Sequence, residues 1–241
     1  LPSEPAPLFD PAVRRLEMKL AQVYDEQLSR TDDAIALLNG VVARDPSDVE
    51  TVQYLEKLLR REGRRDELRQ LLEVKLSQAT DREARISMLS DWANLEQTEF
   101  DSRDRAADLY RRILEVEPGR LSAVRALPQL LLSLQQPDDA ARAIEEQRVH
   151  VEGAARADLE VQLSELYLED LDRPEAALDA AARTLEFSPN DSRAMTVLRR
   201  LVDVPATRRR AAFVLAQSYA QSNDARREAQ ALEAALDAVT E

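Results

Sequence analysis

The 241-residue sequence contains no cysteine, only four glycines and few aromatic residues, which make up 4% of the chain. Without cysteine there is no disulfide, no thiol nucleophile and no thiolate ligand for a metal. Sheet proteins need β-branched and aromatic residues and glycine-rich turns, so a β fold is disfavoured. The glycines are too few for the usual phosphate-binding loop, and no dinucleotide, nucleotide, hydrolase or zinc-protease motif occurs.

The chain also lacks long apolar runs and positive charge. No run reaches the roughly 18 apolar residues that a membrane-spanning helix needs. The net charge is −13, whereas nucleic-acid binding needs a basic surface. We therefore expect no membrane span and no nucleic-acid ligand. Only three of the 33 basic residues are lysine, a bias typical of GC-rich genomes, and we expect a bacterial, cytoplasmic protein.

What the sequence does contain is helix-forming residues. Ala, Leu, Glu and Arg dominate, and all four favour α-helix. The segment LPSEPAPLFDP holds four prolines and predicts an extended linker over residues 1–10. A folded domain is predicted over residues 11–241, with Asp10 as the cap of its first helix. Since the sequence begins at Leu1, we expect an excised piece of a longer protein.

One pattern recurs along the chain. Segments that begin at Leu20, Trp92 and Leu163 share a small second residue, a central alanine and a proline near the end, at intervals of 72 and 71 residues. Such a period predicts stacked helix pairs of about 36 residues, in alternating regular and irregular versions. The recurring residues are Ala21, Ala93 and Ser164, then Ala34, Ala106 and Ala177, then Pro46, Pro118 and Pro189.

These columns have a physical purpose. Small residues let two helix axes approach closely, and the proline ends the second helix of a pair. Gly63 breaks the chain between the helices of an irregular pair. Trp92 shares a column with Leu20 and Leu163, so we expect it in the core.

The same residues resemble the tetratricopeptide repeat (TPR) family, from about residue 12 onward. Its pattern of a small residue, an aromatic, an alanine and a proline is matched by Ala21, Tyr24, Ala34 and Pro46, and again by Ser164, Tyr167, Ala177 and Pro189. The resemblance implies an all-α fold, a right-handed α-solenoid of antiparallel helix pairs. It also implies a non-catalytic protein-interaction scaffold.

The sequence departs from this pattern at several places. Glu96 stands where a tyrosine belongs, and Glu56 and Pro128 stand where a small residue belongs. Pro128 lies inside a predicted helix and should kink or shorten it. Residues 191–210 read as a lone helix followed by the start of another. One partner helix is absent there, so we expect the last unit to stack at a changed angle.

In this family the first helices of successive pairs line a concave groove. A row of polar residues there is suited to binding an extended peptide or a partner helix. It is equally typical of an ordinary solvent-exposed surface that binds nothing. The basic clamp that holds a peptide carboxylate in some members is not matched. We expect a protein or peptide partner of unknown identity, with self-association through the solenoid ends as the alternative. The groove positions by register are Met18, Gln22, Gln53, Lys57, Ser90, Asn94, Arg125, Gln129 and Glu165.

Candidate chemical groups favour structural interpretations. His150 is the only histidine; it stands near a helix end, where a basic residue suits the dipole, and it cannot build a zinc site alone. The pairs Asp32–Asp33 and Asp138–Asp139 stand at helix starts, and one member of Glu145–Glu146 must face solvent. We therefore expect no catalytic residue, no metal and no cofactor, and predict that the chain is not an enzyme.

Two arginine clusters remain. The first is balanced by nearby acids, which favours a solvated face over a phosphate site. The second has no acidic neighbour before Asp224, and both interpretations stay open for it. The clusters are Arg60, Arg61, Arg64, Arg65 and Arg69, and Arg208, Arg209 and Arg210.

Overall fold

The computed structural model describes residues 11–240, with side chains described to residue 237. The chain divides into two compact units, Leu1–Phe100 and Asp101–Glu241. The helices of the first unit are α1 (Pro11–Gln22), α2 (Thr31–Arg44), α3 (Val49–Arg61), α4 (Arg65–Gln78) and α5 (Arg82–Thr98), with a π-helical turn at Val23–Gln27. Those of the second are α6 (Arg103–Val116), α7 (Leu121–Ser133), α8 (Pro137–Gln147), α9 (Gly153–Glu169), α10 (Pro174–Phe187), α11 (Ser192–Val202), α12 (Arg208–Gln221) and α13 (Ala225–Thr240), with a 3-10 turn, η2, at Arg148–His150.

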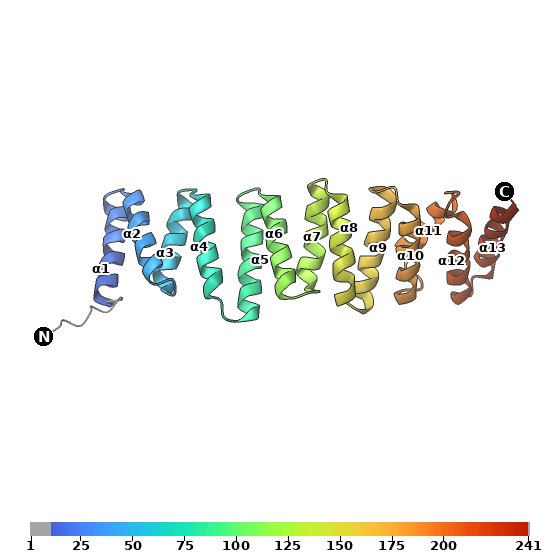
Figure 1. The fold of residues 1–241 in the computed structure, drawn as a ribbon, viewed down its shortest axis with the longest axis horizontal. Helices are drawn as coiled ribbons and strands as arrows, with labels where there is room; N and C mark the ends of the chain where they lie inside the picture. Colours follow the sequence, from blue (N-terminus) through green and yellow to red (C-terminus); the bar gives the residue numbers. More distant parts are fainter. Residues whose placement is uncertain (1–10, 241) are drawn as a thin grey trace. The chain divides into compact units, whose positions relative to one another are not determined.

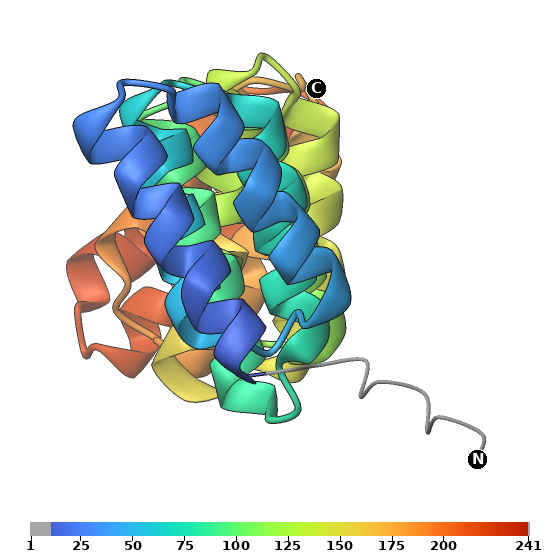
Figure 2. The same ribbon diagram turned by 90° about the vertical axis from the view of Figure 1, so that its left-hand side faces the viewer.

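The described residues confirm the all-α solenoid. No strand occurs among them, and within the units α1–α2, α3–α4, α7–α8, α9–α10 and α12–α13 form antiparallel pairs (Figure 1). Figure 2 shows the first pair, α1 and α2, side by side. The turn inside each pair holds one residue in the left-handed region, where φ is positive. These residues are Ser29, Gly63, Gln135, Asp172 and Asn223.

The predicted proline stops are confirmed. α2, α6 and α10 end at Arg44, Val116 and Phe187, each two residues before a proline of the repeat. The residue between takes nearly the same extended backbone in all three, because the ring of a following proline excludes the helical conformation. These C-cap residues are Asp45 (φ −137°, ψ 89°), Glu117 (φ −142°, ψ 92°) and Ser188 (φ −141°, ψ 83°).

The repeated small residues lie in the core. Ala21, Ala34, Ala93, Ala106, Ser164 and Ala177 have no exposed surface. Trp92 is 7% exposed, as expected of a core residue, whereas Leu20 of the same column is 42% exposed. Leu20 lies on α1, which no described helix precedes. The repeating positions are therefore core positions, while the 72-residue super-period stays a prediction.

The expected shortening of the helix at Pro128 is wrong. α7 runs through Pro128 and has 13 residues, the same length as α3. Proline removes one backbone hydrogen bond at this point. Pro128 is itself buried, so packing against neighbouring side chains offsets the loss.

Two further predictions concern the chain as a whole. The proline-rich linker predicted over residues 1–10 lies outside the described residues, and a single domain over residues 11–241 stays a prediction. Of the helices that the structure describes, none combines the length and the apolar character needed to cross a membrane.

Candidate functional site

The predicted groove residues are divided between the two units. Six lie on α1, α3 and α5 of the first unit, and three on α7 and α9 of the second. Met18 is buried, with 6% of its surface exposed, because its apolar side chain joins the core; it is not available to a partner. Ser90 and Glu165 are half-buried, and the exposed members are Gln22, Gln53, Lys57, Asn94, Arg125 and Gln129.

In the second unit, Gln129 and Glu165 line one groove. It has a volume of about 450 Å³ and is formed by residues of α7, α8, α9 and α11 together with the residue after α9. Arg125 is not part of its lining. We call this the polar groove; its lining residues are Pro128, Gln129, Leu132, Ile144, Gln162, Glu165, Leu166, Glu169, Asp170 and Arg193.

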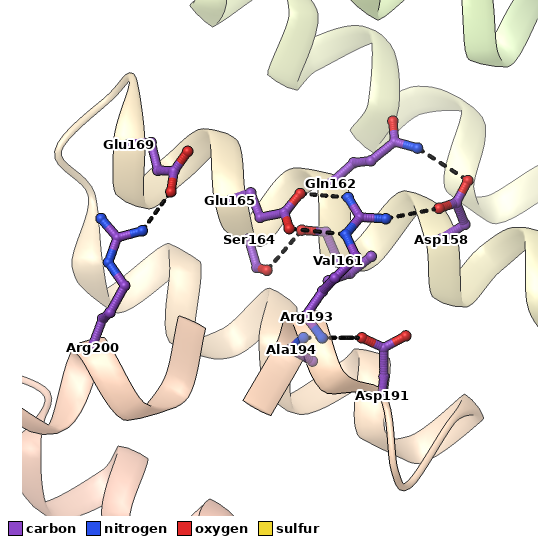
Figure 3. Close-up of polar contacts among 10 residues, drawn as sticks. All are labelled: Asp158, Val161, Gln162, Ser164, Glu165, Glu169, Asp191, Arg193, Ala194 and Arg200. Carbon is purple, nitrogen blue, oxygen red and sulfur yellow. Dashed lines mark hydrogen bonds and ion pairs between the residues drawn. The ribbon is translucent and has the colours of Figure 1, made fainter. Parts of the chain in front are cut away.

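Arg193 of α11 fixes one wall of the polar groove (Figure 3). Its Nε donates to Glu165 Oε1 at 2.9 Å, and its Nη1 donates to Asp158 Oδ1 at 3.2 Å, both on α9. Asp191 caps α11 by accepting from the backbone N–H of Arg193 at 2.9 Å. The hydrogen bonds that the Arg193 guanidinium donates to Glu165 hold its pKa above the usual value. The ion pair therefore joins two first helices.

A second ion pair lies about one turn further along α9 and about two turns further along α11. Arg200 of α11 pairs with Glu169 of α9 (Figure 3). The groove thus carries carboxylates whose guanidinium partners lie on the next first helix, beside the apolar side chains of Leu132 and Leu166. Paired polar groups next to apolar surface can hydrogen-bond a peptide backbone and contact its side chains.

The first unit has a smaller pocket of different composition. It has a volume of about 230 Å³ and lies between α3, α4 and α5. Lys75 Nζ crosses it to Glu56 Oε2 at 2.6 Å. Its described lining contains none of the predicted groove residues, so the five members in this unit other than Met18 stay a prediction.

The first arginine cluster pairs with the adjacent acids Glu62, Asp66 and Glu67 and also with acids of other helices. Arg61 binds Asp25 of the preceding pair, and Arg64 Nη1 lies 2.7 Å from Asp32 Oδ1. The hydrogen bond from Arg61 lowers the pKa of Asp25. The sequence interpretation of a solvated face balanced by adjacent acids is therefore incomplete, because acids some thirty residues away supply much of the pairing.

Two buried carboxylates were missed by sequence reasoning. Glu96 and Glu160 have no exposed surface. Glu96 is held by Arg69 and by Trp92 Nε1 at 3.0 Å. Glu160 is held by Arg148 and Arg183. The sequence offered one sign of a buried carboxylate, the charged residue that replaces the tyrosine of the repeat at position 96. A buried carboxylate with arginine partners has a structural role.

The remaining acidic pairs lie where the sequence predicted. Both aspartate pairs occupy the first turns of α2 and α8. Asp33 accepts from Arg30 Nε at 2.6 Å, and Asp138 pairs with Arg173 Nη2 at 2.7 Å. Glu145 accepts from the Tyr167 hydroxyl at 2.6 Å. Burial and this hydrogen bond raise the pKa of Tyr167 to about 12.

His150 lies in η2, exposed, and its backbone packs against Gly119. Gly119 has φ of +79°, and a Cβ there would stand 2.6 Å from the His150 carbonyl oxygen.

We expect Gly119→Ala to lower the free energy of unfolding by about 2 kcal/mol, because alanine is strained in the left-handed region and its Cβ would clash with His150. Urea denaturation followed by circular dichroism measures it. Gly40→Ala, with φ outside that region and 3.8 Å to its nearest neighbour, is the control and should not destabilise.

The chain therefore has a TPR-like fold, defined by helix pairs, buried small residues and proline-terminated second helices. No protein-family model matches the chain, and no curated protein matches it. Among solved structures, the chain is similar to the C-terminal part of a TPR repeat-containing protein from Cytophaga hutchinsonii, with 12% identity, a TM-score of 0.41, and coverage of 92% of this chain and 94% of that one.

Two more solved structures are similar over part or most of the chain. One is a tetratricopeptide repeat protein from Parabacteroides merdae, at 15% identity and a TM-score of 0.37, with 92% of each chain covered. The other is YrrB, described as a TPR protein with an unusual peptide-binding site, at 18% identity and a TM-score of 0.34, with 63% of this chain and 84% of that chain covered. At these identities the likeness concerns the fold alone.

Proposed function

We propose that this chain is a non-catalytic protein-interaction module whose polar groove binds a segment of a partner protein. The supporting observation is that Gln129, Glu165 and Arg193, from three successive first helices, line one groove. A row of polar groups beside apolar side chains suits an extended peptide or a helix. The groove residues predicted on α1, α3 and α5 of the first unit, other than Met18, are proposed to contact the partner as well.

The test compares the wild-type chain with a Gln129→Ala, Glu165→Gln variant. Both residues are at least partly exposed, so the variant should fold as the wild type does. We expect a partner captured from native extract by the wild type to bind the variant about tenfold more weakly, because truncation removes central contacts of the groove. Calorimetry with the purified partner measures the affinity.

The matched control carries Gln217→Ala and Glu186→Gln, both exposed and outside the polar groove. It changes the same residue types and should keep full affinity. Equal binding of the partner by all three proteins contradicts the groove proposal and moves the interaction to another surface.

A second candidate function is self-assembly. Val13, Leu16 and Leu20 form an apolar stripe on α1 and are 49%, 69% and 42% exposed, and such a stripe suits association with another helix. Sedimentation of the wild-type chain alone separates the two candidates. A concentration-dependent oligomer with no captured partner favours self-assembly, whereas a monomer that captures a partner favours the interaction module.

A further inference from the structure

The second unit lacks one helix of the repeating series. α11 is followed by a short turn over residues 203–207 instead of a second helix, and α12 begins at Arg208. The hydroxyl of buried Thr207 donates to the Leu201 carbonyl at 2.8 Å and closes this turn. α10 consequently contacts α12 as well as α11, and the pair α12–α13 follows (Figure 1). The position between the second helices α10 and α13 is left without a helix.

An apolar groove lies at this position. It has a volume of about 730 Å³ and is lined by residues of α10, α12 and α13. Phe213, Leu232 and Leu236 line it and are 53%, 39% and 67% exposed. Single exposed apolar side chains are ordinary, but three in one groove mark a binding surface. We call this the apolar groove.

Charge at the edge of the apolar groove indicates what binds there. Arg210 is neutralised by Glu175 and Asp179 of α10, each at 2.7 Å. Arg208 donates from Nε to the Val202 carbonyl at 3.2 Å. Arg209 also lines the groove, is exposed, and has no partner in the described part of the chain. The sequence left open whether the run of three arginines at 208–210 binds an acidic group. In the structure Arg209 has the guanidinium that is available, and it favours a carboxylate on the occupant.

A second copy of this chain fits the apolar groove poorly. The exposed apolar stripe of α1, formed by Val13, Leu16 and Leu20, is flanked by the exposed residues Arg15 and Lys19. Docking α1 in the groove brings these cations to Arg209, and like charges in contact oppose association.

We propose that the apolar groove binds an amphipathic helix of a partner protein, which takes the place of the missing second helix. Its apolar face contacts Phe213, Leu232 and Leu236, and a carboxylate near one end pairs with Arg209. This is helix-in-groove recognition, in which anchors spaced three and four residues apart enter the groove. The surface is distinct from the polar groove and does not depend on the function proposed for it.

The probe is a synthetic peptide with the sequence of residues 174–187, acetylated and amidated. It corresponds to α10, a second helix of the kind that is missing, and carries three carboxylates and one arginine. We expect saturable binding to the full chain in calorimetry, with Kd on the order of 10–100 μM. Phe213→Asp should weaken it about tenfold, and Arg209→Glu several-fold. Val149→Asp, at a position 60% exposed outside both grooves, is the matched control and should have no effect.

Two peptide controls test the chemistry. A scrambled peptide of the same composition should not bind. A peptide with the three carboxylates replaced by amides should bind more weakly to the wild type but no more weakly than the original peptide to Arg209→Glu, since that variant has no cation for the carboxylates to pair with. Circular dichroism checks folding; Leu236→Ser, on another helix, repeats the test if Phe213→Asp does not fold.

Several outcomes overturn the proposal. They are the absence of saturable binding up to about 1 mM, equal binding by the Phe213 and Leu236 variants, and equal binding of the scrambled peptide. A wild-type dimer in sedimentation that Phe213→Asp dissociates assigns the groove to a second copy and overturns it as well. The Gln129→Ala, Glu165→Gln variant should bind the peptide as the wild type does. The peptide experiment therefore tests the apolar groove alone, and its outcome is independent of whether the polar-groove proposal fails.

Discussion

Arg69→Met should lower the free energy of unfolding of the first unit by about 3–5 kcal/mol, because it leaves a buried carboxylate without its cation. Arg69 forms a bidentate ion pair with Glu96, in which Nε donates to Oε1 at 2.8 Å and Nη2 donates to Oε2 at 2.7 Å. Glu96 has no exposed surface, so water cannot replace the guanidinium. Arg69 also lies 5.0 Å from the centre of the Phe100 ring. Met fills similar volume without the charge.

The measurement is urea denaturation followed by fluorescence of Trp92. Trp92 is the only tryptophan and donates to Glu96, so its emission reports on this site. Arg60→Met is the control, since Arg60 is exposed and pairs with Glu56 at 3.2 Å; it should cost less than about 1 kcal/mol. The double variant Arg69→Met, Glu96→Met should regain most of the stability. A loss for Arg69→Met no larger than the control's contradicts the argument.

The fold was predictable from the sequence because its signals are local or periodic. Prolines at 46, 118 and 189 predicted where second helices end, since a proline acts on its own backbone and on the residue before it. Buried alanines were predictable because a small residue at a fixed register has one purpose in a helix pair. Pro128 shows the limit of the local rule: the surrounding packing held α7 together through it.

The site was predictable only in part, because it depends on contacts between helices. Register identified Gln129 and Glu165, which the structure brings to one groove. It gave no indication of Arg193, whose pairing with Glu165 depends on how α9 and α11 are rotated against each other. Met18 was misjudged because register gives the side of a helix and not the burial of its side chain. The sequence indicated that a partner helix is absent next to the apolar groove. The residues that line this groove could be identified only from the structure.

Buried charge again dominates the second large prediction, at Glu160 in the second unit. Its two oxygens accept from Arg148 Nη1 at 2.7 Å and Arg183 Nε at 2.9 Å, and Arg156 Nε lies 4.0 Å away. These arginines come from η2, α10 and α9. Because two guanidinium groups share one carboxylate, each can compensate in part for loss of the other. Glu160 thus ties three elements together.

Arg148→Met and Arg183→Met should each lower the free energy of unfolding by about 1–2 kcal/mol, and the double variant by about 4–5 kcal/mol, more than their sum. The excess arises because only the double variant removes both short hydrogen bonds of Glu160. Urea denaturation by circular dichroism, with hydrogen exchange of α9 amides, measures both. Arg173→Met, which breaks an exposed pair with Asp138, should cost less than about 1 kcal/mol. Additivity within about 0.5 kcal/mol would show that the arginines act independently, and that Glu160 does not couple η2 to α10.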